Sequence, residues 1–153
     1  MKEIISKIKH YCAYEDRSTY EVKHKLYGYG VPKTDADKII AQLIQESYLN
    51  EERFAKQFAG GKFRIKNWGR IKIKYALQQK MVSQYNIRTA LESIDHEDYL
   101  KTLQKLADKK WQQLRSKDFI VKKASTQFYL LQKGYEKHLV KKAIDKADSQ
   151  AVS

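Results

Sequence analysis

The pattern of apolar residues along this chain is helical. Apolar side chains recur every three or four residues through most of the sequence, whereas the strict alternation typical of a half-buried strand is rare. A chain of 153 residues with one proline and six glycines also has few positions that interrupt helices. The pattern therefore predicts an all-α fold. The face of the first helix is formed by Ile4, Ile5, Ile8, Tyr11 and Cys12.

Local signals at helix ends predict the same order of elements three times. Arg17-Ser18-Thr19 can cap a second helix that ends near Gly28 to Gly30, and a third helix can start at about Asp35. Asn50 is the predicted N-cap of the next set, because two glutamates follow it in the first turn. Asp95 opens the last set in the same way. Each set predicts three helices.

Three leucines index this repeat. Leu26, Leu77 and Leu130 lie 51 and 53 residues apart, and each is followed five residues later by an apolar residue. A period near fifty with three helices per period is typical of a tandem helical array. We therefore expect three tandem three-helix repeats that form an elongated, curved array. The expected boundaries are 1–49, 50–94 and 95–148, with residues 149–153 as a disordered tail.

One repeat departs from the others at a helix end. The position after the middle helix is Gly30 in the first repeat and Gly134 in the third, and glycine suits the left-handed conformation that often ends a helix. The second repeat has Met81 there. A methionine side chain disfavours that conformation. We therefore expect the helix before Met81 to end differently.

The distribution of positive charge along the chain indicates a function. The formal net charge is +13. The first 50 residues carry eight Lys and Arg against seven Asp and Glu, and the last 53 carry thirteen against five. From Arg53 to Leu91, 39 residues contain ten Lys and Arg and no acid. Unopposed like charges destabilise a compact fold, so this stretch predicts a surface for a polyanion, most commonly a nucleic-acid backbone.

The lysines and arginines that point outward are the candidate binding residues. Ile73 and Leu77 are predicted to face the core, so Arg70, Lys72 and Lys74 should point to solvent. Lys62 and Lys66, which follow the Gly60-Gly61 pair, are expected to lie in a loop or at a helix end. A merely solvated face is the alternative interpretation. The candidate DNA- and filament-binding residues are Lys62, Arg64, Lys66, Arg70, Lys72, Lys74, Lys80, Lys109, Lys110, Lys122 and Lys123, with Lys133, Lys137, Lys141 and Lys142 beyond them.

Aromatic residues are interleaved with these cations. Exposed rings can stack on unpaired bases, but rings at helical spacing usually belong to the core. We place Phe54, Phe58 and Trp111 in the core, and Trp68 in the core or against the following helix start. The sequence leaves open the position of Tyr27, Tyr29 and Tyr85.

Catalytic, metal and cofactor chemistry is not predicted. Gly60-Gly61-Lys62 lacks the spacing of a phosphate-binding loop, and the four histidines are scattered. Cys12 is the only cysteine, which excludes an internal disulfide and a cysteine-based zinc site. We expect it to be a buried structural thiol. We expect a cytoplasmic protein, because the chain has a single cysteine, no apolar signal segment and no membrane-spanning run. Because no catalytic motif is found, we also expect that it is not an enzyme.

One segment resembles a known family. Residues 48–55 read tyrosine-leucine-asparagine-glutamate-glutamate-arginine-phenylalanine-alanine, and a basic stretch, Trp68-Gly69 and a helix with Leu77 follow. This order resembles the central motif of the RecX family of recombinase regulators, and the threefold repeat is similar to that family's fold. The chain departs from the pattern at Arg70, Ala76 and Met81, where the family has a proline, an acidic residue and a glycine.

The resemblance implies a function and partners. Members of the family lie in the groove of the RecA–single-stranded-DNA filament and restrain recombination, ATP hydrolysis and coprotease activity. The expected partners are a RecA-type recombinase filament and single-stranded DNA, with double-stranded DNA as a secondary ligand, and the expected state is a monomer. The near-neutral first repeat is expected to face recombinase protein. The alternatives are a generic nucleic-acid-binding repeat protein without a recombinase partner and a repeat scaffold for acidic proteins.

Overall fold

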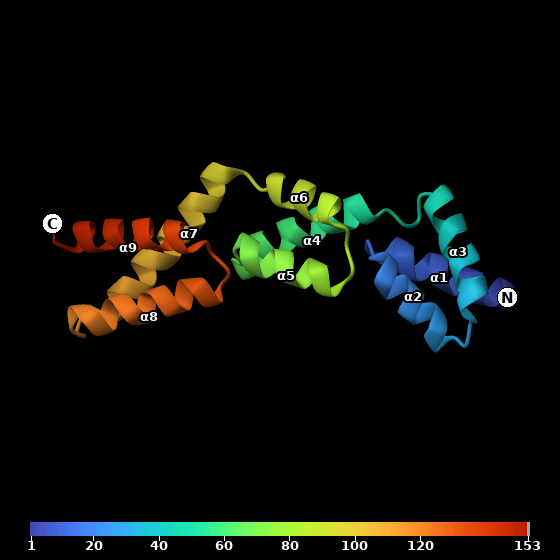
Figure 1. Cartoon of the computed structure of the whole chain (residues 1–153), viewed down its shortest axis with the longest axis horizontal. Coiled ribbons are helices and arrows are strands. Elements are labelled where there is room, and N and C mark those ends of the chain that lie inside the picture. The colour runs from blue at the N-terminus through green and yellow to red at the C-terminus, as the bar shows by residue number, and fades with distance from the viewer. Residues whose placement is uncertain (153) are drawn as a thin grey trace. The chain divides into compact units, whose positions relative to one another are not determined.

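The computed structural model describes residues 1–152, with side chains described through residue 150, and this part of the chain is all-α (Figure 1). It contains nine helices and no strand, so the predicted fold class is confirmed. The predicted tail overlaps the last helix as far as Val152, and Ser153 lies outside the described residues. The helices are α1 Lys2–Tyr14, α2 Thr19–Gly28, α3 Lys33–Gln45, α4 Glu51–Lys66, α5 Arg70–Gln79, α6 Gln84–Glu92, α7 His96–Gln113, α8 Phe119–Gln132 and α9 Lys137–Val152.

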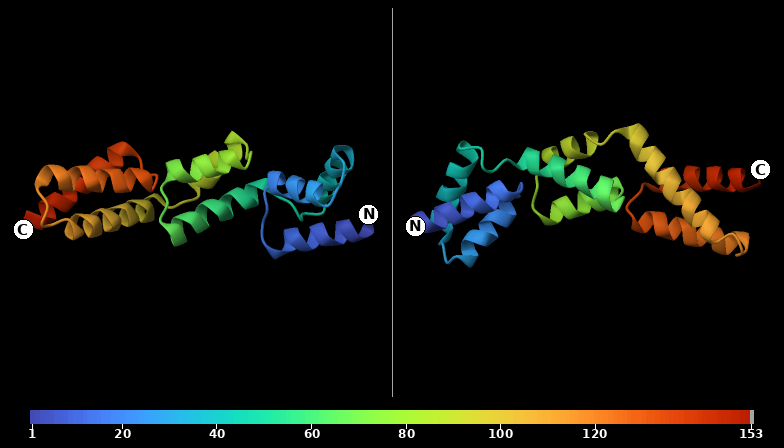
Figure 2. Two further views of the ribbon diagram at one scale, coloured as in Figure 1. Left: turned by 90° about the horizontal axis from the view of Figure 1, so that it is seen from below. Right: turned by 180° about the vertical axis from the view of Figure 1, so that it is seen from behind.

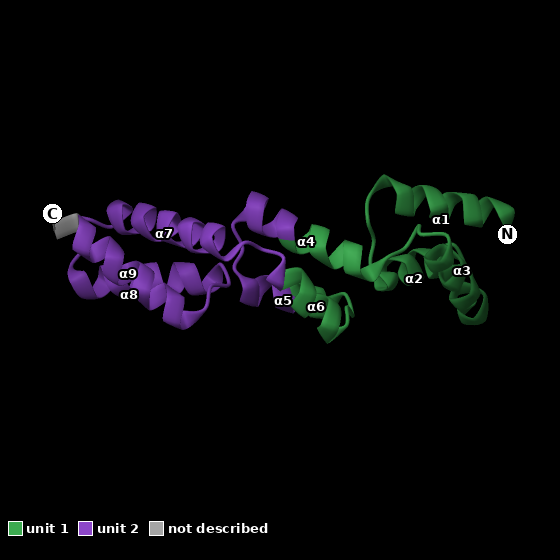
Figure 3. Ribbon diagram, turned by 90° about the horizontal axis from the view of Figure 1, so that it is seen from above, with its two compact units in different colours: residues 1–59, 76–91 green, residues 60–75, 92–153 purple. Residues whose placement is uncertain are grey.

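The chain divides into two compact units (Figure 3). Unit 1 comprises residues 1–59 and 76–91, and unit 2 comprises residues 60–75 and 92–153, so α4 and α5 each contribute to both. Unit 1 carries 12 Lys and Arg against 9 Asp and Glu, whereas unit 2 carries 19 against 9. The excess of positive charge is therefore concentrated in unit 2. The three-repeat boundaries divide the chain differently and stay a prediction.

The core of unit 1 lies between α1, α2 and α3. Ile8, Val22 and Leu26 are fully buried there. The start of α2 is fixed by a capping box: the Ser18 hydroxyl accepts a hydrogen bond from Glu21 N at 3.0 Å, and the Glu21 carboxylate accepts one from Ser18 N at 2.9 Å. The predicted cap is therefore confirmed, and burial of one apolar stripe per helix holds the three helices together.

All three repeats end their middle helix in the same way. The carbonyl of the indexing leucine accepts a hydrogen bond from the apolar residue five positions later, at 3.1, 3.2 and 3.3 Å. Gly30, Met81 and Gly134 all have positive φ, of 84°, 60° and 99°. The expectation that the helix before Met81 ends differently is wrong. The closing hydrogen bond and the burial of Val82 outweigh a left-handed penalty of about 1–2 kcal/mol.

Helix α4 continues through Gly60-Gly61 to Lys66, so Lys62 and Lys66 lie near a helix end, one of the two expected positions, and not in a loop. Ala59 and Phe63 are buried on one face of the helix, and this burial outweighs about 1 kcal/mol per helical glycine. Gly60 is buried as well, and a Cβ on it would lie 2.7 Å from the Arg64 guanidinium. The Arg64 side chain therefore lies back along its own helix.

In unit 2, α7, α8 and α9 pack side by side (Figures 1 and 2). Tyr99, Leu103 and Trp111 form the buried face of α7, and Leu130 of α8 and Val140 of α9 are fully buried. The predicted core position of Trp111 is confirmed by its exposure of 2%. Within the described range, none of the helices combines the length and the apolar character needed to span a membrane.

Candidate nucleic-acid interface

The first turn of α5 is capped by residues far away in the sequence. A helix start leaves backbone N–H groups without partners in the helix. Here the N–H of Gly69 donates to the carbonyl of Lys133 at 2.7 Å, and the N–H of Arg70 donates to the hydroxyl of Tyr99 at 2.9 Å. All four residues belong to unit 2. These bonds fix the start of α5 against the end of α8.

Two glycines allow this close approach. The N–H of Ile71 donates to the carbonyl of Gly134 at 2.9 Å. A Cβ on Gly134 would lie 2.4 Å from the Cβ of Lys72, and a Cβ on Gly69 would lie 2.4 Å from the Gly134 carbonyl. Any side chain at either position would push the two segments apart. The pair of glycines therefore places Lys72 directly beside the turn between α8 and α9.

Arg70 lies inside this junction. Its guanidinium forms an ion pair with Glu136 at 2.8 Å, donates to Nδ1 of His96 at 2.8 Å and lies 3.8 Å from the centre of the Tyr99 ring. The hydroxyl of Tyr99 donates to the other oxygen of Glu136. The Arg70 side chain is 22% exposed, in contrast to the expectation that it points to solvent.

The electrostatics of this group explain the position of Arg70. Burial alone would raise the pKa of the Glu136 carboxyl, but hydrogen bonds from Tyr99 and Arg70 outweigh burial and lower this pKa. Burial, followed by the hydrogen bond to Glu136, raises the pKa of the Tyr99 phenol far above its usual value. At neutral pH the charge of Arg70 is therefore matched by a carboxylate. One feature of the sequence could have indicated that Glu136 has a special partner: it is the only acid between residues 119 and 144.

Lysines gather around Trp68 on the open side of this junction. The ammonium of Lys62 lies 5.0 Å from the centre of the indole ring, and that of Lys72 lies 4.8 Å from it. Lys62 comes from the last two turns of α4 and Lys72 from the first turn of α5. The ring and the two cations are all partly exposed. Trp68 therefore lies between two cations rather than in the core.

A second ring extends the same surface. The ammonium of Lys133 donates to the carbonyl of Lys66 at 3.1 Å and lies 6.0 Å from the centre of the Tyr129 ring. The ammonium of Lys110, from α7, lies 5.1 Å from the same ring. The bond between Gly69 and Lys133 joins this group to Trp68. We call the combined group the basic cluster; it comprises Lys62, Lys66, Trp68, Lys72, Lys110, Tyr129 and Lys133.

Four lysines of the basic cluster carry charge that is not compensated within the fold. In the described part of the chain, no carboxylate lies within ion-pair distance of Lys66, Lys72, Lys110 or Lys133. A cation over an exposed ring is stabilised by only about 0.5–1 kcal/mol and keeps its charge. Because like charges repel, such a group costs stability in the isolated fold and attracts polyanions. The geometry fits phosphates at the ammonium groups.

An open hollow of about 650 Å³ adjoins Tyr129. It lies between α7 and α8 and is lined by Lys110, Ser125 and Phe128 among others. The Phe128 side chain is 65% exposed, which is unusual for a phenylalanine. An aromatic wall beside a cation offers a flat ring for an unpaired base and a charge for its phosphate.

The basic cluster collects only part of the residues predicted from the sequence. Lys62, Lys66, Lys72 and Lys110 are in it, and Lys133, predicted only as one of the lysines beyond the candidates, is central to it. No local signal marks Lys133; its role depends on the carbonyl that it presents to Gly69.

The other predicted residues lie elsewhere. Lys80 belongs to unit 1, where it pairs with Glu21 at 3.5 Å. Lys122 lies 4.3 Å from the centre of the Trp111 ring, near the start of α8 and roughly 16 Å along the helix from Lys133. Lys123 lies 6.0 Å from the Phe119 ring in the same turn. Exposed lysines with no place in the cluster are Lys74 and Lys109.

The basic cluster can bind anions through its lysines and flat groups through its rings. Over the described residues, His, Cys, Asp and Glu side chains nowhere gather in the groups of three that could hold a metal ion. Cys12 lies in the core of unit 1, and burial raises the pKa of its thiol.

Comparisons with known proteins agree with this architecture. The RecX second three-helix domain matches residues 50–91, and the RecX third three-helix domain matches residues 97–144, together more than half of the chain. The crystal structure of RecX from Lactobacillus salivarius superposes with a TM-score of 0.85 at 22% identity and covers 97% of this chain and 99% of that one. That likeness shows the fold.

Curated relatives give the same family. Regulatory protein RecX of Clostridium perfringens strain 13 is 36% identical over 118 residues, which are 76% of this chain and 55% of the relative. Regulatory protein RecX of Clostridium botulinum strain Eklund 17B is 33% identical over 129 residues, which are 83% of this chain and 60% of the relative. The chain thus spans little more than half the length of these relatives. On the two domain matches and these relatives, the chain belongs to the RecX family of regulatory proteins.

Proposed function

We propose that this chain regulates a RecA-type recombinase by binding in the groove of its filament on single-stranded DNA. In that position it restrains recombination, ATP hydrolysis and coprotease activity. The observation that carries the proposal is the basic cluster, whose lysines surround two partly exposed rings in unit 2. Membership in a family of regulatory proteins supports it.

The proposed mechanism is steric and electrostatic. Lysine ammonium groups neutralise phosphates of the bound strand and release its counterions, which favours binding at low salt. Trp68, Tyr129 and Phe128 offer faces on which unpaired bases stack. A regulator held in this way blocks or reshapes the filament and does no chemistry of its own. The single buried cysteine fits action in a reducing compartment, which we propose is the cytoplasm.

The proposal is tested by the salt dependence of binding. Three cluster lysines are replaced in one variant, Lys66→Ala, Lys72→Ala and Lys133→Ala. Each lost phosphate contact on a single strand lowers the slope of log K against log salt by about 0.7, so the slope should fall by about 2. Fluorescence anisotropy with a labelled single strand, bare or coated with recombinase, measures this slope.

A control variant removes the same charge elsewhere in unit 2. Lys101, Lys105 and Lys146 are exposed and lie outside the cluster. Their triple replacement by alanine should leave the slope within about 0.5 of the wild-type value. Equal slopes for the two triple variants would contradict a localised site. Binding to bare DNA that equals binding to the filament would favour a generic nucleic-acid-binding protein.

A further inference from the structure

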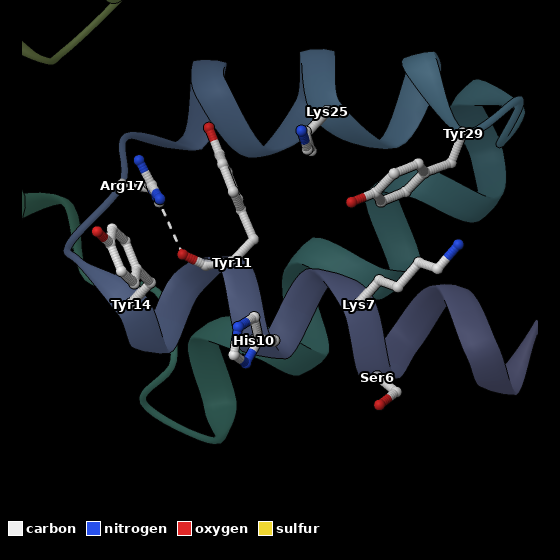
Figure 4. A pocket seen from close by; sticks show the side chains of 8 residues that line it. All are labelled: Ser6, Lys7, His10, Tyr11, Tyr14, Arg17, Lys25 and Tyr29. Atoms are coloured by element: carbon white, nitrogen blue, oxygen red, sulfur yellow. Dashed lines mark hydrogen bonds between the residues drawn. The ribbon is translucent and has the colours of Figure 1, made fainter.

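Unit 1 has an open groove between α1 and α2 that plays no part in the basic cluster (Figure 4). Its volume is about 620 Å³. Tyr11 and Tyr14 of α1 and Tyr29, which follows α2, supply its aromatic rings. Figure 4 shows the ring of Tyr11 and that of Tyr29 spaced along the gap between the two helices, with Lys7 and Lys25 beside them. Rings and cations thus alternate along one groove.

The cations of the groove belong to two kinds. Arg17 holds the groove together: it donates to the Tyr11 carbonyl at 3.0 Å, pairs with Glu15 at 2.7 Å and lies 3.8 Å from the centre of the Tyr11 ring. Lys7 and Lys25 are exposed, and within the described residues no carboxylate lies within ion-pair distance of either. Lys25 lies 5.2 Å from the Tyr11 ring and 5.8 Å from the Tyr29 ring. Its charge remains available to a ligand.

Three acids of unit 1 that lie close in sequence to the groove residues are paired with other cations. Glu15 is paired with Arg17, Asp16 with Arg53 at 2.6 Å, and Glu21 with Lys80 at 3.5 Å. None of the eight residues that line the groove is acidic. The near-neutral charge counted from the sequence therefore hides a local excess of positive charge in the groove. The expectation that the near-neutral first repeat faces recombinase protein stays a prediction.

We propose that this groove binds unpaired nucleotides of a single-stranded nucleic acid, as a second contact separate from the basic cluster. Two ammonium groups that lie beside tyrosine rings match a strand, which presents a phosphate next to every flat base. Tyr14 is 78% exposed and Tyr11 and Tyr29 are partly exposed, so a base can reach each ring. An acidic peptide would use the ammonium groups but leave the three rings without a matching partner. The inference goes beyond the proposed function, because it needs no recombinase.

Photo-crosslinking tests the groove on the full chain. Single-stranded DNA that carries 5-iododeoxyuridine is irradiated with the protein, and adducts are mapped by mass spectrometry. We expect adducts on Tyr11, Tyr14 or Tyr29 in addition to adducts on the rings of the basic cluster. The variant with Lys7→Ala and Lys25→Ala should lose the groove adducts and bind the strand on the order of ten-fold more weakly at 0.1 M salt.

A matched control and two outcomes make the test decisive. Lys33 and Lys38 are exposed on α3, outside the groove, and their double replacement by alanine changes the charge equally. This control should keep the groove adducts. Adducts confined to Trp68 and Tyr129 would overturn the groove and leave the proposed function intact. A groove variant that binds bare DNA normally but the filament weakly would overturn it in favour of a protein partner.

Discussion

The close contact between α5 and the turn between α8 and α9 predicts how a single added methyl group, in the variant Gly134→Ala, changes the free energy of unfolding. Gly134 combines a φ of +99° with so close an approach that an added Cβ would lie 2.4 Å from the Cβ of Lys72. The change Gly134→Ala therefore adds a left-handed penalty of about 1–2 kcal/mol to an overpacking cost of about 1–3 kcal/mol. The weakening of the adjoining backbone hydrogen bonds adds about 1 kcal/mol. We expect a loss of about 3–6 kcal/mol in the free energy of unfolding.

Two further glycines separate these contributions. Gly69 has no positive φ, but a Cβ there would meet the Gly134 carbonyl at 2.4 Å, so Gly69→Ala should cost about 2–4 kcal/mol. Gly61 lies within α4, and a Cβ there has nothing within 4 Å. Gly61→Ala should therefore stabilise the protein by about 0.5–1 kcal/mol. The three changes are alike in chemistry and differ only in surroundings.

Tryptophan fluorescence during urea unfolding is the appropriate assay. The two tryptophans of the chain, Trp68 and Trp111, both belong to unit 2, so the signal reports on the unit that contains all three glycines. The expected order of stability is Gly61→Ala, wild type, Gly69→Ala and Gly134→Ala. A Gly134→Ala variant within about 0.5 kcal/mol of the wild type would refute the close approach, and with it the placement of Lys72 and Lys133 in one cluster.

Three smaller predictions concern single residues. Met81→Gly should stabilise the chain by about 1 kcal/mol, because glycine adopts positive φ without strain; thermal unfolding followed by circular dichroism measures this, and a lower midpoint would contradict it. The pKa of Glu136 is lowered in the fold, so the stabilisation by its carboxylate is complete above the unfolded pKa near 4.5 and is lost as pH falls through the folded pKa. Glu136→Gln should therefore cost about 1.5–3 kcal/mol of unfolding free energy at pH 7 and make that free energy less dependent on pH below about 4.5. An unchanged pH profile would exclude the ion pair between Glu136 and Arg70. Burial raises the pKa of Cys12, so its reaction with a disulfide reagent at pH 8 should be at least about tenfold slower in the native protein than in denaturant, and equal rates would show an exposed thiol.

The sequence predicted those parts of the fold that depend on local pattern. Apolar spacing located the helices, and Ser18, Asn50 and Asp95 act as the caps that the sequence indicated, with hydrogen bonds of 3.0, 2.9 and 3.0 Å to the N–H group three residues on. The Gly60-Gly61 pair suggested a loop, but burial of Ala59 and Phe63 keeps α4 helical across the pair. Local propensity was outweighed by packing that lies outside the local window.

The candidate site could be predicted only in part, for the same reason. Acid-free sequence identified Lys62, Lys66 and Lys72 as binding candidates, but their proximity to Lys133 depends on a contact between segments more than sixty residues apart. Arg70 has the same local pattern as Lys72, yet Glu136 binds its charge inside the fold. A cation remains available to a ligand only if no carboxylate pairs with it in the fold. Such carboxylates, like Glu136, can lie far away in the sequence.

The central claim is that this chain acts on a recombinase filament, and titration of ATP hydrolysis tests it most directly. Recombinase is assembled on saturating single-stranded DNA, and the full chain is added in increasing amounts while ATP hydrolysis is measured. A regulator in the filament groove should inhibit hydrolysis at amounts well below those that cover the strand, and the Lys66→Ala, Lys72→Ala and Lys133→Ala variant should need more protein for the same effect. Inhibition that begins only when the added protein covers the strand, or no inhibition at all, would contradict the claim.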